Sequence, residues 1–279
     1  LFESERFKEY LKTMSKFYNY SFNNTLLIAM QKPDATLIAG YTAWQRNFDR
    51  HVMKGEKGIK ILAPAPYKVQ EEREKLDPAT QKPVLDKDGK PVTETVEVTR
   101  PAFKVVSVFD VSQTDGKELP DIAVDELTGS VENYAAFFDA LKELSPVPIA
   151  FENITDGAKG YFSHVENRIA IQEGMSEIQT IKTAIHEIAH AKLHAVTPGE
   201  KVAPEDKKDR RTKEVEAESV AYTVCQRYGI ETSDYSFGYI AGWSSDKETK
   251  ELKGSLETIR KTAAEMITGI DEKLKERLA

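Results

Sequence analysis

The pattern of apolar and polar positions predicts alternating short helices and strands in the first part of the chain. Apolar residues recur at helical spacing in SERFKEYLKTMSKFY, and FNNTLLIAMQ predicts a second helix that ends before Pro33. TLIAG predicts a short extended segment, YTAWQRNFD another short helix, and KGEKGIKILAPAPY a glycine-marked basic loop that leads into a strand. This mixture is typical of a small α+β domain.

A charged segment interrupts this pattern. Residues 70–100 contain three prolines, and the DKDG sequence that ends at Gly89 is a signal for a hairpin turn. We predict a protruding, partly mobile insertion that carries no chemistry. The apolar run AFKVVSVFDV that follows predicts a buried strand. SQTDGKELPD then predicts an interdomain linker, so we expect one domain over residues 1–118 and a second over residues 119–279.

The second part of the chain predicts a helical unit with a small sheet. VENYAAFFDALKEL predicts a helix, PVPIAF an extended segment, and GYFSHVENRIAIQ a hairpin around Glu166 and Asn167. Ser176 and Gln179 form a capping-box signature, so the next helix should begin near Glu177. Its core-facing stripe is predicted to contain four isoleucines: Ile178, Ile181, Ile185 and Ile188.

Two further helical segments complete this unit. One is predicted through TKEVEAESVAYTVCQRYG and ends at Gly229. The last segment predicts one long helix, or two helices broken near Gly254 or Gly269. We therefore expect an α+β protein, with an N-terminal α+β domain and a C-terminal, mainly helical domain that contains a small sheet.

Composition narrows the class of protein. With 279 residues, 40% of them hydrophobic and 30% charged, the chain is typical of a globular protein with room for two cores. No stretch approaches the roughly 18 apolar residues of a membrane helix, and the start lacks the layout of a secretory signal, so we expect no membrane partner. The chain begins at Leu1, and we expect further residues upstream. Its single cysteine, Cys225, excludes an internal disulfide, suits a reducing cytoplasm and is expected to be buried in a helix.

Charge is distributed unevenly along the chain. The net charge is −7, yet residues 1–68 hold 11 Lys/Arg and 6 Asp/Glu, a net of +5. Residues 121–279 hold 20 Lys/Arg and 29 Asp/Glu, a net of −9. This asymmetry suggests two units with different partners. The alternative is that the two parts have solvated faces that happen to differ.

His186, Glu187 and His190 spell H-E-x-x-H within the helix predicted to begin near Glu177. Residues four apart lie on one face of a helix, so the two imidazoles can bind one ion. Imidazole nitrogen suits zinc, and a catalytic zinc site leaves a position for water. Glu187 lies beside His186 and can act on that water as a general base. We therefore expect a Zn²⁺ site with Glu187 as the catalytic residue.

A site with two histidines needs a third ligand, and KEVEAESVAY on the next helix offers Glu214, Glu216 and Glu218. Glu214 and Glu218 share a face of the helix, whereas Glu216 points elsewhere. We favour Glu214 as the ligand and Glu218 as the hydrogen-bond acceptor that orients a histidine. The alternative is that all three are solvated charges.

Other polar residues near the motif receive weaker assignments. His194 lies about 12 Å from His186 by helix rise, too far to bind the same ion, and is expected to rim the cleft or cap the helix end. His164 either lines a substrate groove or lies exposed in its turn. Tyr161 and Tyr222 are candidate donors to an oxyanion.

The second unit resembles zincin-type metallopeptidase domains of the ImmA/IrrE group and the C-terminal domain of ArdC-type antirestriction proteins. In those proteins H-E-x-x-H is followed by E-x-E-A-x-x-x-A on a second helix, and the first glutamate of that motif is the third ligand. EVEAESVA, which begins at Glu214, matches the pattern. The resemblance therefore also implies Glu214 as a ligand.

The first unit resembles the ArdC-like N-terminal domain found on conjugative and integrative elements. YSFNNTLLIAMQKPDATLIAGYTAW, VMKGEKGIKILAPAPY and VFDVSQTDGKELP look like its three blocks, whereas the 70–100 insertion and the C-terminal helix lie outside the resemblance. The resemblance implies binding of single-stranded DNA without sequence preference. Such binding uses basic groups on phosphates and aromatic faces on bases. Trp44 is expected to pack inside, and the candidate DNA-binding residues are three lysines and three aromatic residues: Lys54, Lys57, Lys60, Tyr20, Tyr41 and Phe48.

Together these features predict a cytoplasmic antirestriction protein of a mobile element. It is expected to bind single-stranded DNA, and its zinc metallopeptidase domain is expected to hydrolyse an unidentified protein. One alternative is a non-catalytic, DNA-coating protein with a structural zinc. Another is a regulatory peptidase that cleaves a repressor of the element.

Overall fold

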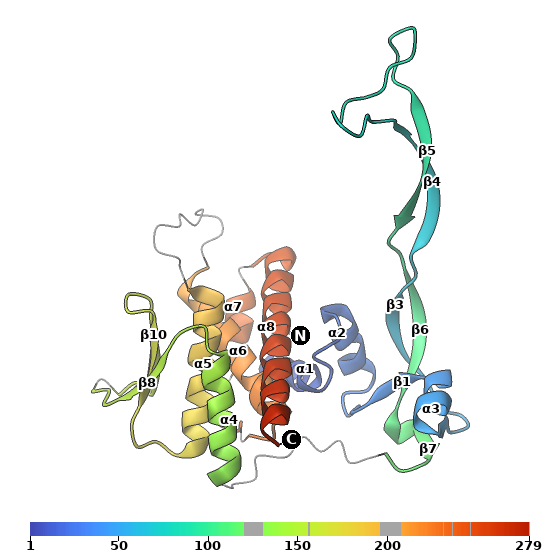
Figure 1. Ribbon diagram of the computed structural model, residues 1–279. Helices are drawn as coiled ribbons and strands as arrows, with labels where there is room; N and C mark the ends of the chain where they lie inside the picture. The colour runs from blue at the N-terminus through green and yellow to red at the C-terminus, as the bar shows by residue number, and fades with distance from the viewer. Residues whose placement is uncertain are drawn as a thin grey trace.

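The structure is a computed structural model that describes residues 1–119, 131–155, 157–195, 208–230, 232–235, 237–245 and 247–278. The elements of the first part are α1 (Ser4–Lys16), α2 (Phe22–Gln31), β1 (Ile38–Gly40), α3 (Tyr41–Phe48), β2 (Arg50–Val52), β3 (Ile59–Pro64), β4 (Tyr67–Glu74), β5 (Thr93–Arg100), β6 (Phe103–Asp110), η1 (Val111–Gln113) and β7 (Thr114–Gly116). Those of the second part are α4 (Val131–Leu144), β8 (Ile149–Glu152), β9 (Gly160–Ser163), β10 (Arg168–Gln172), α5 (Glu177–His194), α6 (Arg210–Arg227), α7 (Ile240–Ser244) and α8 (Thr249–Leu278). The predicted α+β class is confirmed, with small sheets in both parts and long helices in the second (Figure 1).

The first part is built on the antiparallel sheet β1-β6-β3. One face of this sheet packs against α2, in a small core that includes Ile28, Ile59 and Val108. The free edge of β3 is covered by two amide side chains of α2. Asn24 exchanges two hydrogen bonds of 2.8 Å with the backbone of Leu62, and Gln31 exchanges two of 2.9 Å with that of Lys60. These amides take the place of a neighbouring strand, which protects the edge from pairing with another chain.

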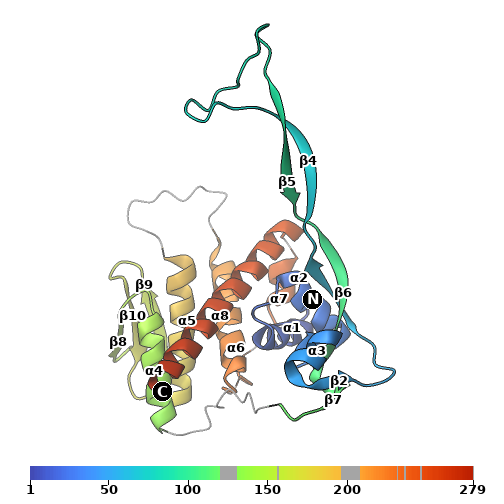
Figure 2. The ribbon, with the colours of Figure 1, turned by 45° about the vertical axis from the view of Figure 1, so that its right-hand side comes forward.

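The predicted insertion is a long two-stranded arm. β4 and β5 pair in antiparallel register from Tyr67↔Arg100 to Glu74↔Thr93, and Figures 1 and 2 show the arm projecting far from the rest of the protein. Its turn is stabilised by Asp86, whose carboxylate accepts from the backbone N–H groups of Asp88 and Lys90. Gly89 has a φ of 77°, a conformation that glycine adopts without strain. The predicted protrusion and hairpin turn are both confirmed.

The strand predicted to be buried, β6, is buried on only one face. Val108 is 7% exposed, whereas Phe103 is 68% and Val105 66% exposed. A continuous apolar run is typical of a strand covered on both faces. Here α2 covers one face, and the other carries no helix beyond α3 among the residues that the structure describes (Figure 1).

In the second part, helices α4, α5, α6 and α8 pack together beside the sheet β8-β10-β9. α5 begins at Glu177 as predicted, and the Ser176 hydroxyl accepts from the Gln179 backbone N–H at 3.3 Å. Of the predicted stripe, Ile178 is 49% exposed because it lies in the first turn, whereas its three companions are buried. α8 is one continuous helix of 30 residues. It approaches α4 so closely that a Cβ at Gly269 would lie 2.5 Å from Leu144 Cδ2.

The first helix departs from the predicted domain division. Although α1 lies within residues 1–118, its apolar face is buried in the core formed by α4, α5, α6 and α8. Phe7 and Leu11 are both 0% exposed in this core. Tyr18, just after the end of α1, also contacts the second part, because its ring lies 5.3 Å from the guanidinium group of Arg227 on α6. The periodicity of α1 predicts an apolar face, but not the partner that covers it.

No helix in the described part of the chain is long and apolar enough to cross a membrane.

Cys225 is fully buried in α6, as predicted, and burial raises the pKa of its thiol to about 12.

Replacing Asp110 with asparagine is expected to destabilise the protein by about 2–3 kcal/mol at neutral pH. The Asp110 carboxylate is 1% exposed and accepts hydrogen bonds from the backbone of Thr36, Leu37 and Ser112. Burial alone would raise its pKa, but these hydrogen bonds hold the pKa below its usual value. Its contribution is therefore complete above about pH 4 and is lost as the pH falls through the folded-state pKa.

Urea unfolding at neutral pH and at about pH 3 measures this effect. The destabilisation caused by D110N should shrink in acid, because the wild-type carboxyl then loses its charge too. Asp115→Asn, a change at an exposed residue of β7, serves as the control. Equal stability of D110N and wild type at neutral pH would contradict the prediction.

Candidate metal centre

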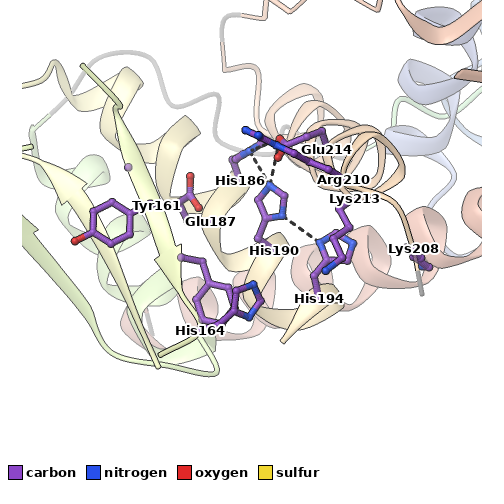
Figure 3. A pocket seen from close by; sticks show the side chains of 12 residues that line it. Tyr161, His164, His186, Glu187, His190, His194, Lys208, Arg210, Lys213 and Glu214 are labelled. Carbon is purple, nitrogen blue, oxygen red and sulfur yellow. Dashed lines mark hydrogen bonds and ion pairs between the residues drawn. The ribbon is translucent and has the colours of Figure 1, made fainter. Parts of the chain in front are cut away.

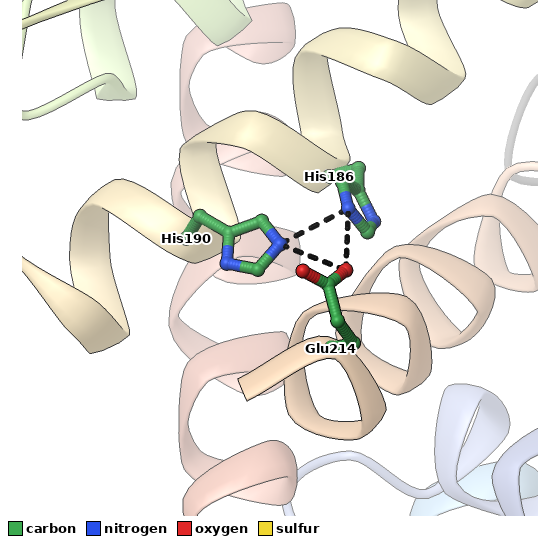
Figure 4. Close-up of side chains that lie close together, drawn as sticks. All are labelled: His186, His190 and Glu214. Atoms are coloured by element: carbon green, nitrogen blue, oxygen red, sulfur yellow. Dashed lines mark hydrogen bonds and ion pairs between the residues drawn. The ribbon is translucent and has the colours of Figure 1, made fainter. Parts of the chain in front are cut away.

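Helices α5 and α6 lie side by side and bring the H-E-x-x-H histidines to a carboxylate of the neighbouring helix (Figure 4). His186 Nε2 lies 3.1 Å from His190 Nε2. Glu214 Oε2 lies 3.7 Å from His186 Nε2 and 3.5 Å from His190 Nε2. The three ligand atoms therefore converge on one point between the two helices.

This donor set fits a single divalent ion. A tetrahedral zinc ion with ligands at 2.0–2.1 Å holds neighbouring ligand atoms about 3.3 Å apart. The three separations observed, between 3.1 and 3.7 Å, lie close to that value. Two imidazoles and one carboxylate also form a ligand set that leaves a further coordination position open.

The protonation states favour coordination. Burial, assisted by the neighbouring His190, lowers the pKa of His186 to about 4, so this imidazole is neutral at physiological pH. The close approach of His190, whose Nε2 lies 3.5 Å from Glu214 Oε2, is the main cause that lowers the pKa of Glu214 and keeps its carboxylate ionised. A neutral imidazole and an ionised carboxylate are the forms that bind a metal.

Glu187 lies beside this site, on the side of β9 (Figure 3). It is 8% exposed, and burial is the main cause that raises its pKa to about 7, with the charge of Glu214 acting in the same direction. The backbone N–H of Phe162 donates to its carboxyl group. Close packing of β9 on α5 depends on Gly160, where a Cβ would lie 2.6 Å from Thr183 Cγ2 and 3.4 Å from Glu187 Cγ. The strand therefore confines Glu187 next to the three candidate ligands.

His194 has a part that the sequence did not indicate. As expected, it lies at the end of α5 and lines the cleft, but it is also 5% exposed and its Nδ1 lies 3.1 Å from His190 Nδ1. Its Nε2 lies 3.1 Å from Glu216 Oε2, and Lys208 Nζ donates to both oxygens of that carboxylate at 2.7 and 2.8 Å. A chain of hydrogen bonds thus runs behind His190, away from the ligand atoms.

The donor and acceptor in each of these hydrogen bonds follow from the ionisation state of Glu216, the last residue of the series. Glu216 is 0% exposed; burial alone would raise its pKa, but His194 and Lys208 lower it overall, so it is an ionised acceptor. His194 Nε2–H must then donate to Glu216, which leaves His194 Nδ1 to accept from His190 Nδ1–H. This tautomer directs the lone pair of His190 Nε2 toward Glu214 and His186.

Glu218 differs from its predicted place. Its carboxylate accepts a hydrogen bond from the hydroxyl of Tyr239, not from a ligating imidazole. Burial, together with the charges of Glu214 and Asp234, raises the pKa of Glu218 to about 7. It lines a neighbouring cavity of about 340 Å³ together with His186 and Glu187. The residue within hydrogen-bond distance of His190 Nδ1 is instead His194, which also contacts Glu216.

His186, His190 and Glu214 open onto a cleft of about 530 Å³ between β9 and the start of α6. His164 lines this cleft and is exposed, which combines the two places predicted for it. The hydroxyl of Tyr161 instead binds Glu152 and points away from the ligands (Figure 3), and Tyr222 is 6% exposed against Phe237. Neither tyrosine is placed as a donor to an oxyanion at this site.

The predicted DNA-binding residues lie in the first part and divide into two groups. Lys54, Lys57, Lys60 and Tyr41 are exposed. Tyr20 is half-buried with its ring 5.9 Å from that of Phe17, and Phe48 is half-buried 4.9 Å from the ring of Trp44. Trp44 is fully buried, as expected, and donates to the carbonyl of Phe109 at 2.9 Å. Tyr20 and Phe48 therefore support the packing of this part.

Comparison with known proteins identifies two domains in the chain. Residues 2–109 match the N-terminal domain of the anti-restriction factor ArdC, and residues 145–228 match the IrrE N-terminal-like domain of the M78 peptidases. The chain thus joins an ArdC-type N-terminal domain to an IrrE-like, metallopeptidase-like domain. This is the domain make-up that its motifs predicted, and the resemblance to ArdC-type antirestriction proteins is confirmed.

Individual relatives agree with this assignment. An uncharacterized protein of Bacillus anthracis is 29% identical over 94% of this chain, which spans about half (47%) of that protein. DNA primase TraC of Escherichia coli is 34% identical over 50% of this chain and 12% of its own length. Both proteins are therefore longer than the region they share with this chain.

Crystal structures of the antirestriction protein ArdC from plasmid R388 share the fold. The metal-free structure aligns over 92% of this chain and 84% of its own, with a TM-score of 0.50 and 22% identity. The Mn(II)-bound structure aligns over 91% of this chain and 84% of its own, with a TM-score of 0.53 and 19% identity.

Proposed function

We propose that this protein binds single-stranded DNA through its ArdC-type domain and hydrolyses a peptide bond of a protein through its IrrE-like domain, as part of an antirestriction function of a mobile element. The observation that carries the proposal is the convergence of His186, His190 and Glu214 beside the buried Glu187. The division at residue 118 remains our proposal for the two functions, although α1 packs with the second core.

Zn²⁺ is the ion that we propose for the three ligands, because two imidazoles and a carboxylate form a zinc set in metallopeptidases. The Mn(II) in the ArdC relative makes manganese the rival ion. A divalent ion held here would act as a Lewis acid on a peptide carbonyl and on water. Around it, His194 and Glu216 would hold the tautomer and orientation of His190.

Glu187 would accept the proton of the attacking water and deliver it to the leaving amine. Burial raises the pKa of Glu187, which makes it a stronger base toward water than an exposed carboxylate. The cleft of about 530 Å³ is large enough to admit a peptide segment beside this carboxyl group.

Metal analysis of the purified protein tests the proposal. We expect about one ion per chain in the wild type and none in His186→Ala, because two ligands do not hold a divalent ion tightly. His164→Ala is the matched control, since His164 lines the same cleft and is not part of the ligand cluster. A wild-type protein that takes up no stoichiometric zinc or manganese would remove the basis of the proposed peptidase.

Replacing Glu216 with glutamine is expected to weaken metal binding by about 10- to 100-fold without abolishing it. The neutral amide keeps the size of the side chain but can no longer act as a purely accepting partner for His194. Competition with a chelator measures the affinity. Glu265→Gln, at an exposed partner of Lys192, is the control. Unchanged affinity in E216Q would show that His190 needs no support from this chain of hydrogen bonds.

A further inference from the structure

The sheet β1-β6-β3 has an open face whose composition is unusual for a protein surface. In an antiparallel pair, opposing residues point to the same side, and the register pairs Lys60 with Ser107, Leu62 with Val105 and Pro64 with Phe103. The side that points away from α2, here called the outer face, therefore comprises Ala39, Lys60, Leu62, Pro64, Phe103, Val105, Ser107 and Phe109.

Two large apolar side chains of the outer face are exposed to solvent, whereas Leu62 and Phe109 are partly buried. Phe103 is 68% and Val105 66% exposed. Tyr41 of α3, which is 52% exposed, extends this surface, since its ring lies 6.2 Å from that of Phe109. Single exposed apolar residues are common, but a contiguous group on one sheet face marks a binding surface.

The positive charge on and beside the outer face favours a negatively charged partner. It contains no acidic residue, and the ammonium group of Lys60 lies on it, 2.6 Å from the Ser107 hydroxyl. The basic loop before β3 lies directly against it, because a Cβ at Gly58 would be 2.8 Å from Ser107 Cβ and 3.1 Å from Phe109 Cζ. Lys54 and Lys57 of this loop are exposed, and neither forms an ion pair with a residue in the described ranges.

Exposed aromatic rings beside unpaired lysines match the chemistry of single-stranded nucleic acid. Bases stack on aromatic faces whatever their identity, and ammonium groups accompany the phosphates. From Phe103 to Phe109 the strand spans about 20 Å, which suffices for several nucleotides. A protein partner would have to present acidic groups beside an apolar surface, whereas every nucleotide of single-stranded DNA carries both a base and a phosphate.

We propose that single-stranded DNA lies along the outer face, with bases stacked on Phe103 and Tyr41 and phosphates near Lys60, Lys54 and Lys57. This inference rests on the proposed DNA-binding function and locates it. Phe103 and Val105 take the place of Tyr20 and Phe48 among the contacts, because the latter are occupied in packing.

Fluorescence anisotropy with a labelled oligothymidylate of about 20 nucleotides tests the proposal on the full-length protein. Phe103→Ala is expected to weaken binding by about 5- to 100-fold, the cost of one lost stacking contact. Lys60→Gln is expected to reduce the slope of log affinity against log salt by about 0.7, because one fewer phosphate is neutralised. Phe151→Ala is the matched control, since Phe151 is 43% exposed on the sheet of the other domain.

The outcomes separate this inference from the function on which it rests. A wild-type protein that does not bind the oligonucleotide overturns the DNA-binding function itself. Wild-type binding that is unchanged in F103A, with an unchanged salt slope in K60Q, overturns the outer face as its site and leaves DNA binding in place. Loss of self-association in F103A with full DNA binding also overturns it, because the face is then a protein interface. Unchanged melting temperatures ensure that both variants are folded.

Discussion

Replacing Glu187 with glutamine is expected to abolish antirestriction while leaving DNA binding and metal content intact. The amide has the same shape but cannot accept the proton of water, and loss of a general base typically slows a reaction by about 10²- to 10⁴-fold. Because Glu187 is absent from the cluster of three ligand residues, the metal should remain bound. The measurement is transfer of unmodified DNA into a restricting host, with oligonucleotide binding and metal analysis of the same variant.

Glu177→Gln provides the control for E187Q, because Glu177 lies on the same helix but is exposed in its first turn. Full protection by E187Q would contradict a catalytic role and favour a DNA-coating protein whose metal is structural. Appearance of a specific repressor fragment that depends on Glu187 would instead favour the regulatory peptidase.

The double replacement of Phe7 and Leu11 with alanine is expected to unfold the metallopeptidase-like domain. Each side chain is 0% exposed in the core that also contains residues of α6. Truncation of a buried phenylalanine costs about 3–5 kcal/mol and of a buried leucine about 2–5 kcal/mol. Their sum is comparable to the whole stability of a typical domain. Glu214 lies on α6, so metal binding should be lost together with the fold.

Thermal unfolding followed by circular dichroism, together with metal analysis, measures the effect of F7A/L11A. Met30→Ala removes a side chain that is 74% exposed on α2 and should leave both signals unchanged. A double variant that unfolds cooperatively near the wild-type temperature and keeps its metal would show that α1 is dispensable for this domain.

Local patterns predicted the elements well because each depends on neighbouring residues. The Ser176 cap, the DKDG turn and the limits of α2 all follow from short-range chemistry. Which elements pack against one another depends on contacts between distant segments. The local patterns of a single sequence do not specify those contacts. The apolar run of β6 predicted a buried strand, although only one face of this strand is covered.

The candidate site shows the same limit. H-E-x-x-H and the following glutamate motif predicted His186, His190 and Glu214, since the spacing of each motif fixes one face of a helix. The link from His194 to Glu216 crosses between two helices, and its geometry depends on how they pack. The spacing of His194, four residues after His190, could have predicted this link. Residues four apart share a face of a helix, so His194 must point toward the same neighbouring helix as His190.

The placement of α1 has a consequence for synthesis of the protein on the ribosome. α1 is made before α6 and α8, yet its apolar face is completed by these later helices, and a hydrogen bond from Arg260 to the carbonyl of Tyr18 joins positions 242 residues apart. The first helix must therefore wait, with apolar side chains uncovered, while the sheet, the arm and most of the other helices emerge. A nascent chain that ended before α8 would therefore contain the complete sheet β1-β6-β3 but an incomplete core around α6.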